Sequence, residues 1–176
     1  MPTDAELVAR CLDGDEEAYR ALVLRYQDGL YRYALRMVGS PDAAEDMVQL
    51  TLIKAYRSLG RCREPDRFGS WVFRILSNRC KDYLKSRQGR ETAIPEDWPD
   101  PGGDPSEGAE RADLLRRVQH ALLELPPAQR EAFVLKHVEG LSYEEIAERL
   151  DVSIGSLKMR VFRAREALRE LLGGAW

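Results

Sequence analysis

The sequence of 176 residues is poor in cysteine and has no long apolar run, and both features exclude classes of protein. Its three cysteines, Cys11, Cys62 and Cys80, form no CxxC pair, and their odd number argues against a disulfide framework. No apolar stretch approaches the ~20 residues that span a bilayer. The acidic N-terminal residues follow the pattern of an amphipathic helix rather than that of an export signal. We therefore expect reduced thiols and a cytoplasmic location.

The sequence also lacks the groups of residues that would indicate catalysis or metal binding. No serine, histidine and aspartate combine in a nucleophile motif, and no glycine-rich loop of the phosphate-binding kind is present. The two histidines, His120 and His137, have no cysteine or acidic residue at the spacing of metal ligands. We interpret both as packing or surface residues, and we expect the protein to be no enzyme and to need no cofactor or metal.

The net charge of −3 is made up of blocks of opposite sign. Residues 54–90 carry eleven bases against three acids, and residues 156–176 carry five bases against two acids. Residues 91–110 contain seven acids and no base. Because nucleic acid binds to a local basic surface, the distribution of charge is more informative than its average. The two basic blocks are therefore candidate DNA-binding segments.

Residues 94–108 divide the chain, since they hold four prolines and three glycines among acidic residues. Such a stretch cannot bury enough apolar surface to offset the entropy that is lost on ordering. On both sides of it, apolar residues recur at helical spacing, and no alternating strand pattern is convincing. The sequence predicts an all-α protein with two small helical domains, residues 1–90 and 111–176, joined by a flexible acidic linker over residues 91–110.

Turn and capping residues give the expected bounds of the helices. Thr3 or Asp4 is suited to cap the first helix, and Asp42 to cap the third. In the N-terminal half, we expect a first helix that ends at Cys11 and a second over about residues 16–38. A third should run from the Asp42 cap to about Leu59, and a fourth over about residues 68–87. The C-terminal helices are expected over residues 112–123, 127–138, 143–150 and 154–172.

The last two predicted helices have the pattern of a helix-turn-helix. Ser142 and Glu145 are spaced to form a capping box, and Ser153 is placed to cap the next helix after a short turn. Apolar residues of both helices share one stripe that we expect to be buried: Ile146, Ala147, Leu150, Ile154, Leu157, Val161 and Ala164. Residues outside that stripe suit phosphates and base edges in a major groove: Ser156, Lys158, Met159, Arg160, Arg163 and Arg165. A solvated basic face on an ordinary helical hairpin is the alternative.

Two parts of the sequence resemble the domains of one known family. Region 4 of the extracytoplasmic-function (ECF) sigma factors, which reads promoters, resembles the stretch LPPAQREAFVLKHVEGLSYEEIAERLDVSIGSLKMRVFRAREAL. Region 2 of the same family resembles ALVLRYQDGLYRYALR, DAAEDMVQLTLIKAYRSL and RFGSWVFRILSNRCKDYL. The resemblance implies a transcription initiation factor of the sigma-70 family, which binds core RNA polymerase and helps to open promoter DNA.

The resemblance also implies roles for the candidate DNA-binding residues. The helix-turn-helix residues would read the upstream (−35) element as duplex DNA. The fourth helix interleaves basic and aromatic residues, which suits single-stranded DNA, and Asn78 sits where the family reads an exposed base of the −10 element. The expected −10 contacts are Arg61, Cys62, Arg63, Trp71, Arg74, Asn78, Lys81, Asp82 and Lys85. For Trp71 and Phe73, an ordinary place in the core is the alternative.

The resemblance implies that the third predicted helix docks on the coiled coil of the polymerase's largest subunit. Its candidate contacts lie away from the apolar stripe of the helix: Asp46, Gln49, Leu50 and Lys54. Leu50 stands where the family commonly has an acidic residue, which weakens a purely electrostatic account of docking. Cys62 stands where an aromatic residue is common, and both a plain substitution and a redox sensor remain open. An ordinary solvated helix face is the alternative for the docking surface.

Two rival functions remain open from the sequence alone. A helix-turn-helix repressor or activator would bind duplex DNA without polymerase, and an adaptor would use its N-terminal domain only to bind protein. The acidic linker either threads through polymerase channels, as in the family, or merely solvates the tether. The resemblance further implies control by a dedicated anti-sigma factor, and we expect no insertion into a membrane.

Overall fold

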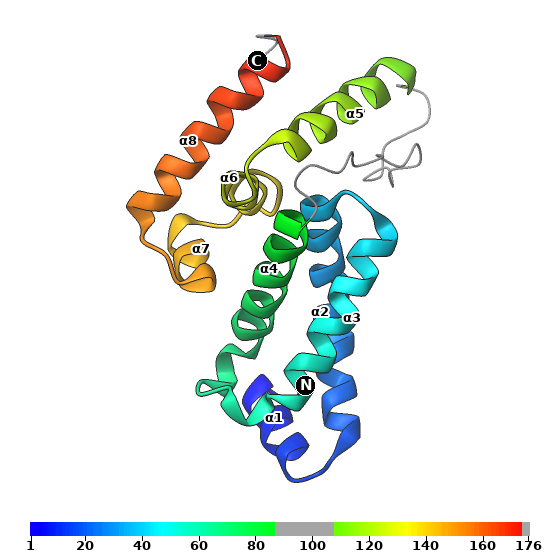
Figure 1. Ribbon diagram of the computed structural model, residues 1–176. Helices are drawn as coiled ribbons and strands as arrows, with labels where there is room; N and C mark the ends of the chain where they lie inside the picture. The colour runs from blue at the N-terminus through cyan, green and yellow to red at the C-terminus, as the bar shows by residue number, and fades with distance from the viewer. Residues whose placement is uncertain (87–107, 174–176) are drawn as a thin grey trace.

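The computed structural model describes residues 1–86 and 108–173, and these residues form helices, turns and loops without any strand (Figure 1). The N-terminal helices are α1 (Asp4–Leu12), α2 (Glu16–Val38), α3 (Pro41–Arg57) and α4 (Phe68–Ser86), with 3-10 turns at Leu59–Arg61 and Pro65–Arg67. The C-terminal helices are α5 (Gly108–Glu124), α6 (Pro127–Phe133) with a π-helical turn after it (Val134–Val138), α7 (Tyr143–Leu150) and α8 (Ile154–Leu171). The all-α prediction is confirmed. Within the described ranges, no helix is long and apolar enough to cross a membrane.

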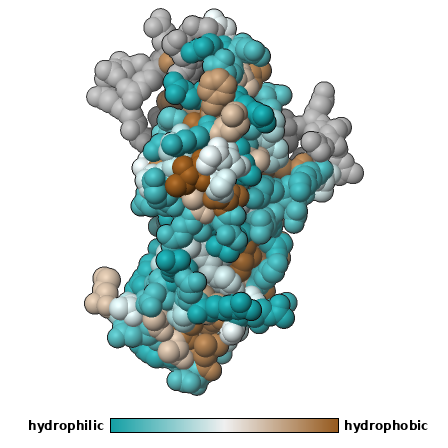
Figure 2. Space-filling view, turned by 90° about the vertical axis from the view of Figure 1, so that its left-hand side faces the viewer, coloured by the Kyte–Doolittle hydropathy of each residue, from teal (hydrophilic) through white to brown (hydrophobic). Residues whose placement is uncertain are grey.

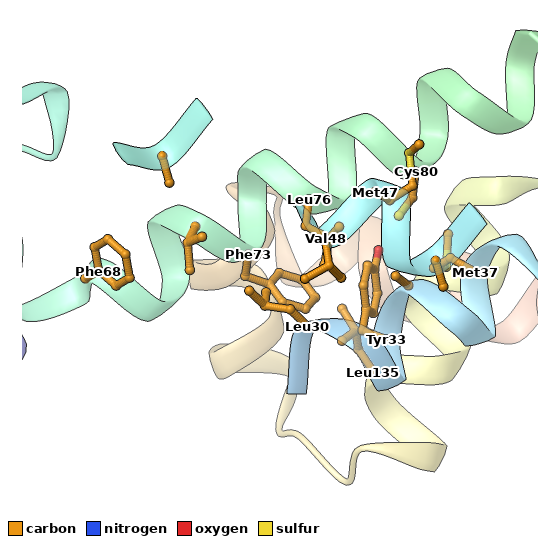
Figure 3. Packing of buried hydrophobic residues seen from close by; sticks show 14 of the residues in the cluster. Leu30, Tyr33, Met37, Met47, Val48, Phe68, Phe73, Leu76, Cys80 and Leu135 are labelled. Carbon is orange, nitrogen blue, oxygen red and sulfur yellow. The ribbon is translucent and has the colours of Figure 1, made fainter. Parts of the chain in front are cut away.

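The N-terminal domain is a bundle of α1 to α4 around an apolar core. Figure 3 shows Leu30 and Tyr33 of α2 together with Val48 of α3 and with Phe73 and Leu76 of α4. The ring centroids of Tyr33 and Phe73 are 4.5 Å apart in a tilted contact, which aromatic pairs prefer. Each helix thus turns an apolar stripe inward and leaves its charged residues outside.

The ends of α3 show where two sequence predictions were wrong. Ser40, and not Asp42, caps the helix: Pro41 fits the first helical position, and the Ser40 hydroxyl accepts a backbone N–H of the first turn. The helix ends at Arg57 rather than at Leu59, because the chain tightens there into a 3-10 turn that begins at Leu59. These differences move the predicted helix by two residues toward the N-terminus without changing its length or which face it buries.

The helices α7 and α8 form the predicted helix-turn-helix. The capping box of Ser142 and Glu145 is present, and Ser153 caps α8. Asp151 ends α7 in the left-handed conformation, with a φ of 58°, and so turns the chain sharply into α8. Of the predicted stripe, Ile146, Leu157, Val161 and Ala164 are buried, whereas Ala147, Leu150 and Ile154 are partly exposed.

The two domains pack against each other. The helix α7 lies beside α4 (Figure 1), and Leu135 of the C-terminal domain joins the same apolar cluster as Tyr33 (Figure 3). Gly39, which ends α2 with a φ of 73°, lies so close to α5 that a Cβ there would come within 2.7 Å of Leu123 Cδ1. The sequence predicted two domains but not this contact between them. The predicted linker lies outside the described residues except for residues 108–110, which already belong to α5.

Candidate nucleic-acid interface

A groove of about 550 Å³ runs between α3 and α4. Its lining combines cations, an amide and aromatic rings: Met47, Lys54, Trp71, Arg74, Ile75, Asn78, Arg79, Asp82, Tyr83 and Ser86. Asn78 is exposed, so its amide is open both to donate and to accept hydrogen bonds. The Nε atoms of Arg74 and Arg79 are buried and have no hydrogen-bond partner in the part of the chain that the structure describes. Unpaired bases of a polyanionic strand would supply partners to the exposed Asn78 amide.

The residues of α4 that were predicted to contact single-stranded DNA divide between two faces of the helix. Asn78 and Asp82 line the groove, and Lys85 is exposed beyond them. Lys81 instead turns toward the C-terminal domain, where its Nζ lies 3.3 Å from a carboxylate oxygen of Glu131. The structure therefore separates Lys81 from the other candidates on this helix.

The two aromatic residues near the start of α4 differ in environment. Phe73 is only 6% exposed, as the core alternative expected. Trp71 is half-buried with its ring centroid 5.8 Å from that of Phe68, yet it lines both the groove and the pocket next to it. Of these two rings, only Trp71 is placed to offer a stacking surface to a base.

The pocket beside the groove has a volume of about 270 Å³ and collects arginines, and we call it the arginine pocket. It is lined by Arg61, Cys62, Arg63, Glu64, Arg67, Ser70, Trp71 and Arg74, together with Glu148 from α7. Cys62 is 7% exposed, and its Sγ lies 3.6 Å from the carbonyl oxygen of Glu64. Burial raises the pKa of the Cys62 thiol, and a buried, protonated thiol is a poor nucleophile. This environment favours a plain substitution over a redox sensor.

The outer face of α8 carries most of the predicted duplex contacts. Lys158, Met159, Arg163 and Arg165 are exposed, whereas Ser156 and Arg160 are partly buried. A Cβ placed on Gly155 would meet nothing within 4 Å, so the start of the helix is open. The side of the molecule that Figure 2 turns to the viewer is largely hydrophilic, with small and separate hydrophobic patches.

Sequence reasoning missed one residue of this face. Phe162 is 59% exposed, and Met159 beside it is 51% exposed. An apolar residue is assigned to the core by default, although Phe162 falls outside the helical stripe of Leu157, Val161 and Ala164. That departure from the stripe is the signal that could have identified it.

The exposed face of α3 forms a third surface, distinct from the groove. Asp46, Gln49 and Leu50 are exposed, as the sequence indicated. Lys54 is also exposed, one turn beyond Leu50 on the same helix, and it lines the groove between α3 and α4. The docking set predicted from sequence therefore reaches from this face of α3 to the edge of the groove.

An apolar hollow adjoins this face of α3. It has a volume of about 730 Å³, and its lining includes Tyr19, Gln49, Ile53 and Tyr56. Ile53 and Tyr56 are each 47% exposed, and neither was singled out from the sequence. Tyr19 Oη donates to the carbonyl oxygen of Leu52 at 2.6 Å, and burial raises the pKa of Tyr19 to about 12, so this phenol stays neutral. The surface on α3 is thus partly polar and partly apolar.

The two histidines line neither the groove, nor the arginine pocket, nor the apolar hollow. Both are exposed, and the His137 ring lies 4.8 Å from that of Phe133. Partial burial, and then the charges of Arg165 and Lys136, lower the pKa of His137. Within residues 1–86 and 108–173, no group of three or more His, Cys, Asp or Glu side chains is placed to hold a metal ion.

Comparisons with known proteins assign the chain to one family. The family described as Sigma-70 region 2 matches residues 22–90, and Sigma-70, region 4 matches residues 115–168. The chain is 39% identical over 178 residues to the ECF RNA polymerase sigma-E factor of Escherichia coli K12, which covers 94% of this chain and 92% of that relative. It is 36% identical over 180 residues to the RNA polymerase sigma-H factor of Pseudomonas aeruginosa, with 96% and 93% covered. The chain belongs to the ECF group of the sigma-70 family.

Solved structures of related proteins resemble this sigma factor along most of its length. CnrH, in complex with the cytosolic domain of CnrY, matches with a TM-score of 0.69 and 28% identity over 98% of this chain and 99% of that chain. The sigma factor RpoE of Bartonella quintana, in complex with the anti-sigma factor NepR, matches with a TM-score of 0.66 and 28% identity over 90% and 98%. The two-domain helical architecture is therefore shared with these proteins.

The matched regions divide the surfaces of this sigma factor. Region 2 contains α3, α4, the groove between them and the loop at the arginine pocket, whereas region 4 contains α6 to α8. Glu148 belongs to region 4, yet it completes a pocket that is otherwise built by region 2.

Proposed function

We propose that this sigma factor binds core RNA polymerase, directs it to promoters by reading −35 and −10 elements, and promotes DNA opening. The observation that carries this function is the presence of both family regions in one chain, each with a surface of its own. The outer face of α8 suits duplex DNA, and the groove with the arginine pocket suits an unpaired strand. The sigma factor makes no bonds itself, since the polymerase carries out the chemistry.

Recognition of the −35 element belongs to α8. A helix fits the major groove, where basic side chains reach phosphates and guanine edges. Lys158, Arg163 and Arg165 make such contacts, and Ser156 and Arg160 complete the polar set. Met159 and Phe162 are exposed and apolar, and they suit the methyl groups of thymine. We therefore add Phe162 to the residues expected to read this element.

Capture of the −10 strand belongs to the groove between α3 and α4. Separating stacked base pairs costs about 1.4 kcal/mol per step, whereas stacking of an extruded base on an aromatic ring contributes about 1–3 kcal/mol. Trp71 supplies the ring, and Asn78 binds the edge of a base. Arg74 and Lys54 hold the backbone, which moves Lys54 from the polymerase contacts to the strand contacts. Stacking and base contacts thus offset the cost of melting.

Docking on the polymerase belongs to the exposed face of α3. Asp46 and Gln49 supply polar contacts, and Leu50 and Ile53 supply apolar ones. A mixture of this kind is typical of protein–protein interfaces. Because Leu50 carries no charge, we expect docking to depend less on salt concentration than a purely ionic contact would.

Control by an anti-sigma factor is part of this proposal. The structures of CnrH and of RpoE each contain a bound partner, which for RpoE is the anti-sigma factor NepR. A comparable partner of this chain would cover surfaces that polymerase or promoter DNA requires. We place the protein in the cytoplasm, where bacterial polymerase and DNA are found.

Run-off transcription with purified core polymerase and genomic DNA tests the function directly. We expect start sites that require this chain and that share −35 and −10 elements. The absence of any chain-dependent start site would overturn the proposal. Tight, specific binding of duplex DNA by the chain without polymerase would favour the repressor or activator alternative.

Two variants test the surfaces separately. Asn78→Ala should abolish promoter opening, detected by permanganate reactivity of unpaired thymines, while polymerase binding stays intact. An adaptor that binds only protein would open no promoter in either form. Gly155→Asp places a carboxylate at the open start of α8 and should weaken −35 recognition in filter binding without affecting polymerase binding. Loss of polymerase binding in either variant would contradict the division of surfaces.

A further inference from the structure

The first residue of α1 is a carboxylate that has little contact with water. The Asp4 side chain is 10% exposed; the Arg25 guanidinium forms an ion pair with it, and the Tyr26 hydroxyl donates to it. Both partners lie in the middle of α2. A carboxylate is stable away from water only when it is paired and hydrogen-bonded. These contacts therefore fix the start of α1 to α2.

The formation of α1 does not depend on Asp4. Thr3 is the N-cap residue, and together with Glu6 it forms a capping box. Leu7 and Val8, each 1% exposed, hold the helix in the core beside the start of α4 (Figure 1). The contacts of Asp4 are thus additional to those that cap and bury the helix.

Tyr26 also contacts the start of α4. Its ring centroid lies 5.7 Å from that of Phe68, the first residue of that helix. The two helices meet so closely that a Cβ on Gly69 would come within 2.6 Å of Tyr26 Cε1. Burial, and then the hydrogen bond to Asp4, raise the pKa of Tyr26 to about 12, so its hydroxyl stays protonated and donates. Tyr26 is therefore held between Asp4 and the first turn of α4.

The contacts continue to the ring that is proposed to stack on a base. Phe68 is 1% exposed, and its ring centroid lies 5.8 Å from that of Trp71. A series of contacts therefore runs without a gap from Asp4 through Tyr26 and Phe68 to Trp71. Trp71 lines the groove and the arginine pocket, whereas Asp4 and Tyr26 line neither. Any effect of these two residues on an unpaired strand must therefore act through other side chains.

We propose that Asp4 and Tyr26 are positioning residues for strand capture, which fix the Trp71 ring in the orientation that receives an unpaired base. The inference rests on the stacking role proposed for Trp71. A side chain that must be ordered on binding weakens the affinity by about two- to tenfold. Because Tyr26 and Phe68 order the Trp71 ring beforehand, the strand does not have to do so.

Strand binding by the holoenzyme tests the proposal. The probe is a fluorescein-labelled non-template strand of about 12 nucleotides, which covers the −10 element of a promoter mapped by run-off transcription. Asp4→Ala should weaken binding of the probe about two- to tenfold, while the affinities for core polymerase and for a −35 duplex stay the same. Tyr26→Phe keeps the ring but loses the hydroxyl, and it should weaken binding about twofold. It replaces Asp4→Ala if that variant fails to fold by circular dichroism.

Asp15→Ala is the matched control for stability. Asp15 pairs with Arg10 at 2.7 Å near the other end of α1 and caps α2, but it is not a member of the series that leads to Trp71. This variant should lower the melting temperature as Asp4→Ala does and leave strand binding unchanged. Equal weakening of strand binding by both variants would overturn the proposal, because the affinity would then follow the stability of α1.

A double-mutant cycle with Trp71→Ala separates positioning from a general loss of folded protein. If Asp4 acts through Trp71, Asp4→Ala should weaken strand binding in the unchanged chain but not in the Trp71→Ala chain. The same fold-change in both backgrounds would contradict positioning.

Failure of the proposed function has a different signature. If Trp71→Ala alone left strand affinity unchanged, the stacking role of Trp71 would be wrong, and the inference that rests on it would be wrong too. If Trp71→Ala weakened strand binding but Asp4→Ala and Tyr26→Phe did not, only the positioning role would be wrong.

Discussion

The substitution Glu131→Ala gives the strongest test of the packing between the two regions. It removes a carboxylate that is 0% exposed and that bonds to Tyr33, Ser77 and Lys81. Removing one partner of a buried charged pair costs about 3–5 kcal/mol. The hydroxyls of Tyr33 and Ser77 would also lose their acceptor, at about 1–3 kcal/mol each if they stayed buried. If the regions separate, water satisfies these hydroxyls and removes this second cost. We therefore expect the free energy of unfolding to fall by about 3–5 kcal/mol.

Urea unfolding followed by circular dichroism measures this loss, and a double-mutant cycle assigns it. The cycle combines Glu131→Ala with Tyr33→Phe, and the coupling energy should be about 1–3 kcal/mol. Glu131→Gln is the matched control, because it keeps the shape and one acceptor oxygen but loses the charge that pairs with Lys81. The free energy of unfolding should fall less in Glu131→Gln, by about 1–2 kcal/mol.

A near-silent substitution would refute the reasoning. If Glu131→Ala changed the free energy of unfolding by less than about 0.5 kcal/mol, as an exposed surface residue does, the carboxylate would be hydrated in solution. A coupling energy of zero with Tyr33→Phe would support the same conclusion. The two regions would then not pack against each other in the free chain.

Three further predictions concern α8, the junction at α5 and the core. Phe162→Ala should leave the free energy of unfolding nearly unchanged, since the ring is 59% exposed. It should weaken holoenzyme binding to a −35 duplex by about 1 kcal/mol in a competition assay. Equal binding would remove Phe162 from the residues expected to read the −35 element. Gly39→Ala should lower the melting temperature more than Gly140→Ala, because both have a positive φ but only the first meets Leu123, and equal shifts would contradict that contact. Burial raises the pKa of Cys80 from 9.0 to about 12. The contribution of its protonated thiol to the free energy of unfolding is therefore fully present below pH 9. It is lost as the pH rises toward 12, by up to about 4 kcal/mol. Urea unfolding at several alkaline pH values should show a shallower dependence in Cys80→Ala, and an unchanged slope would argue against this cause.

Local chemistry explains why the helix-turn-helix could be predicted from the sequence. The capping box of Ser142 and Glu145 and the cap at Ser153 involve residues three apart, so the pattern of letters already contains the geometry. The cap of α3 is equally local, but its prediction was wrong, because Ser40 and Asp42 are both good capping residues and Pro41 decides between them.

The packing of region 4 against region 2 could not be predicted in this way. Tyr33 and Glu131 are 98 positions apart in the sequence, and no periodic pattern indicates that they meet. The string around Arg130 and Glu131 supported the resemblance to region 4, but it gave these two residues no role. Helical periodicity likewise indicated that Lys54 and Lys81 lie off the apolar stripes, but not which neighbour each would face.

The two faces of α4 have a consequence for genetic work on this protein. Ser77, which is 1% exposed, and Asn78, which is exposed, are consecutive, yet the first bonds to Glu131 and the second lines the groove. A substitution at one position that disturbs the helix also displaces the other, and a screen that scores only reporter expression would confuse the two. Loss at Asn78 removes a side chain that lines the groove, whereas loss at Ser77 removes a hydrogen bond between the two regions and lowers stability. Adjacent codons along this one helix therefore affect different properties of the protein, and reporter expression alone does not distinguish them.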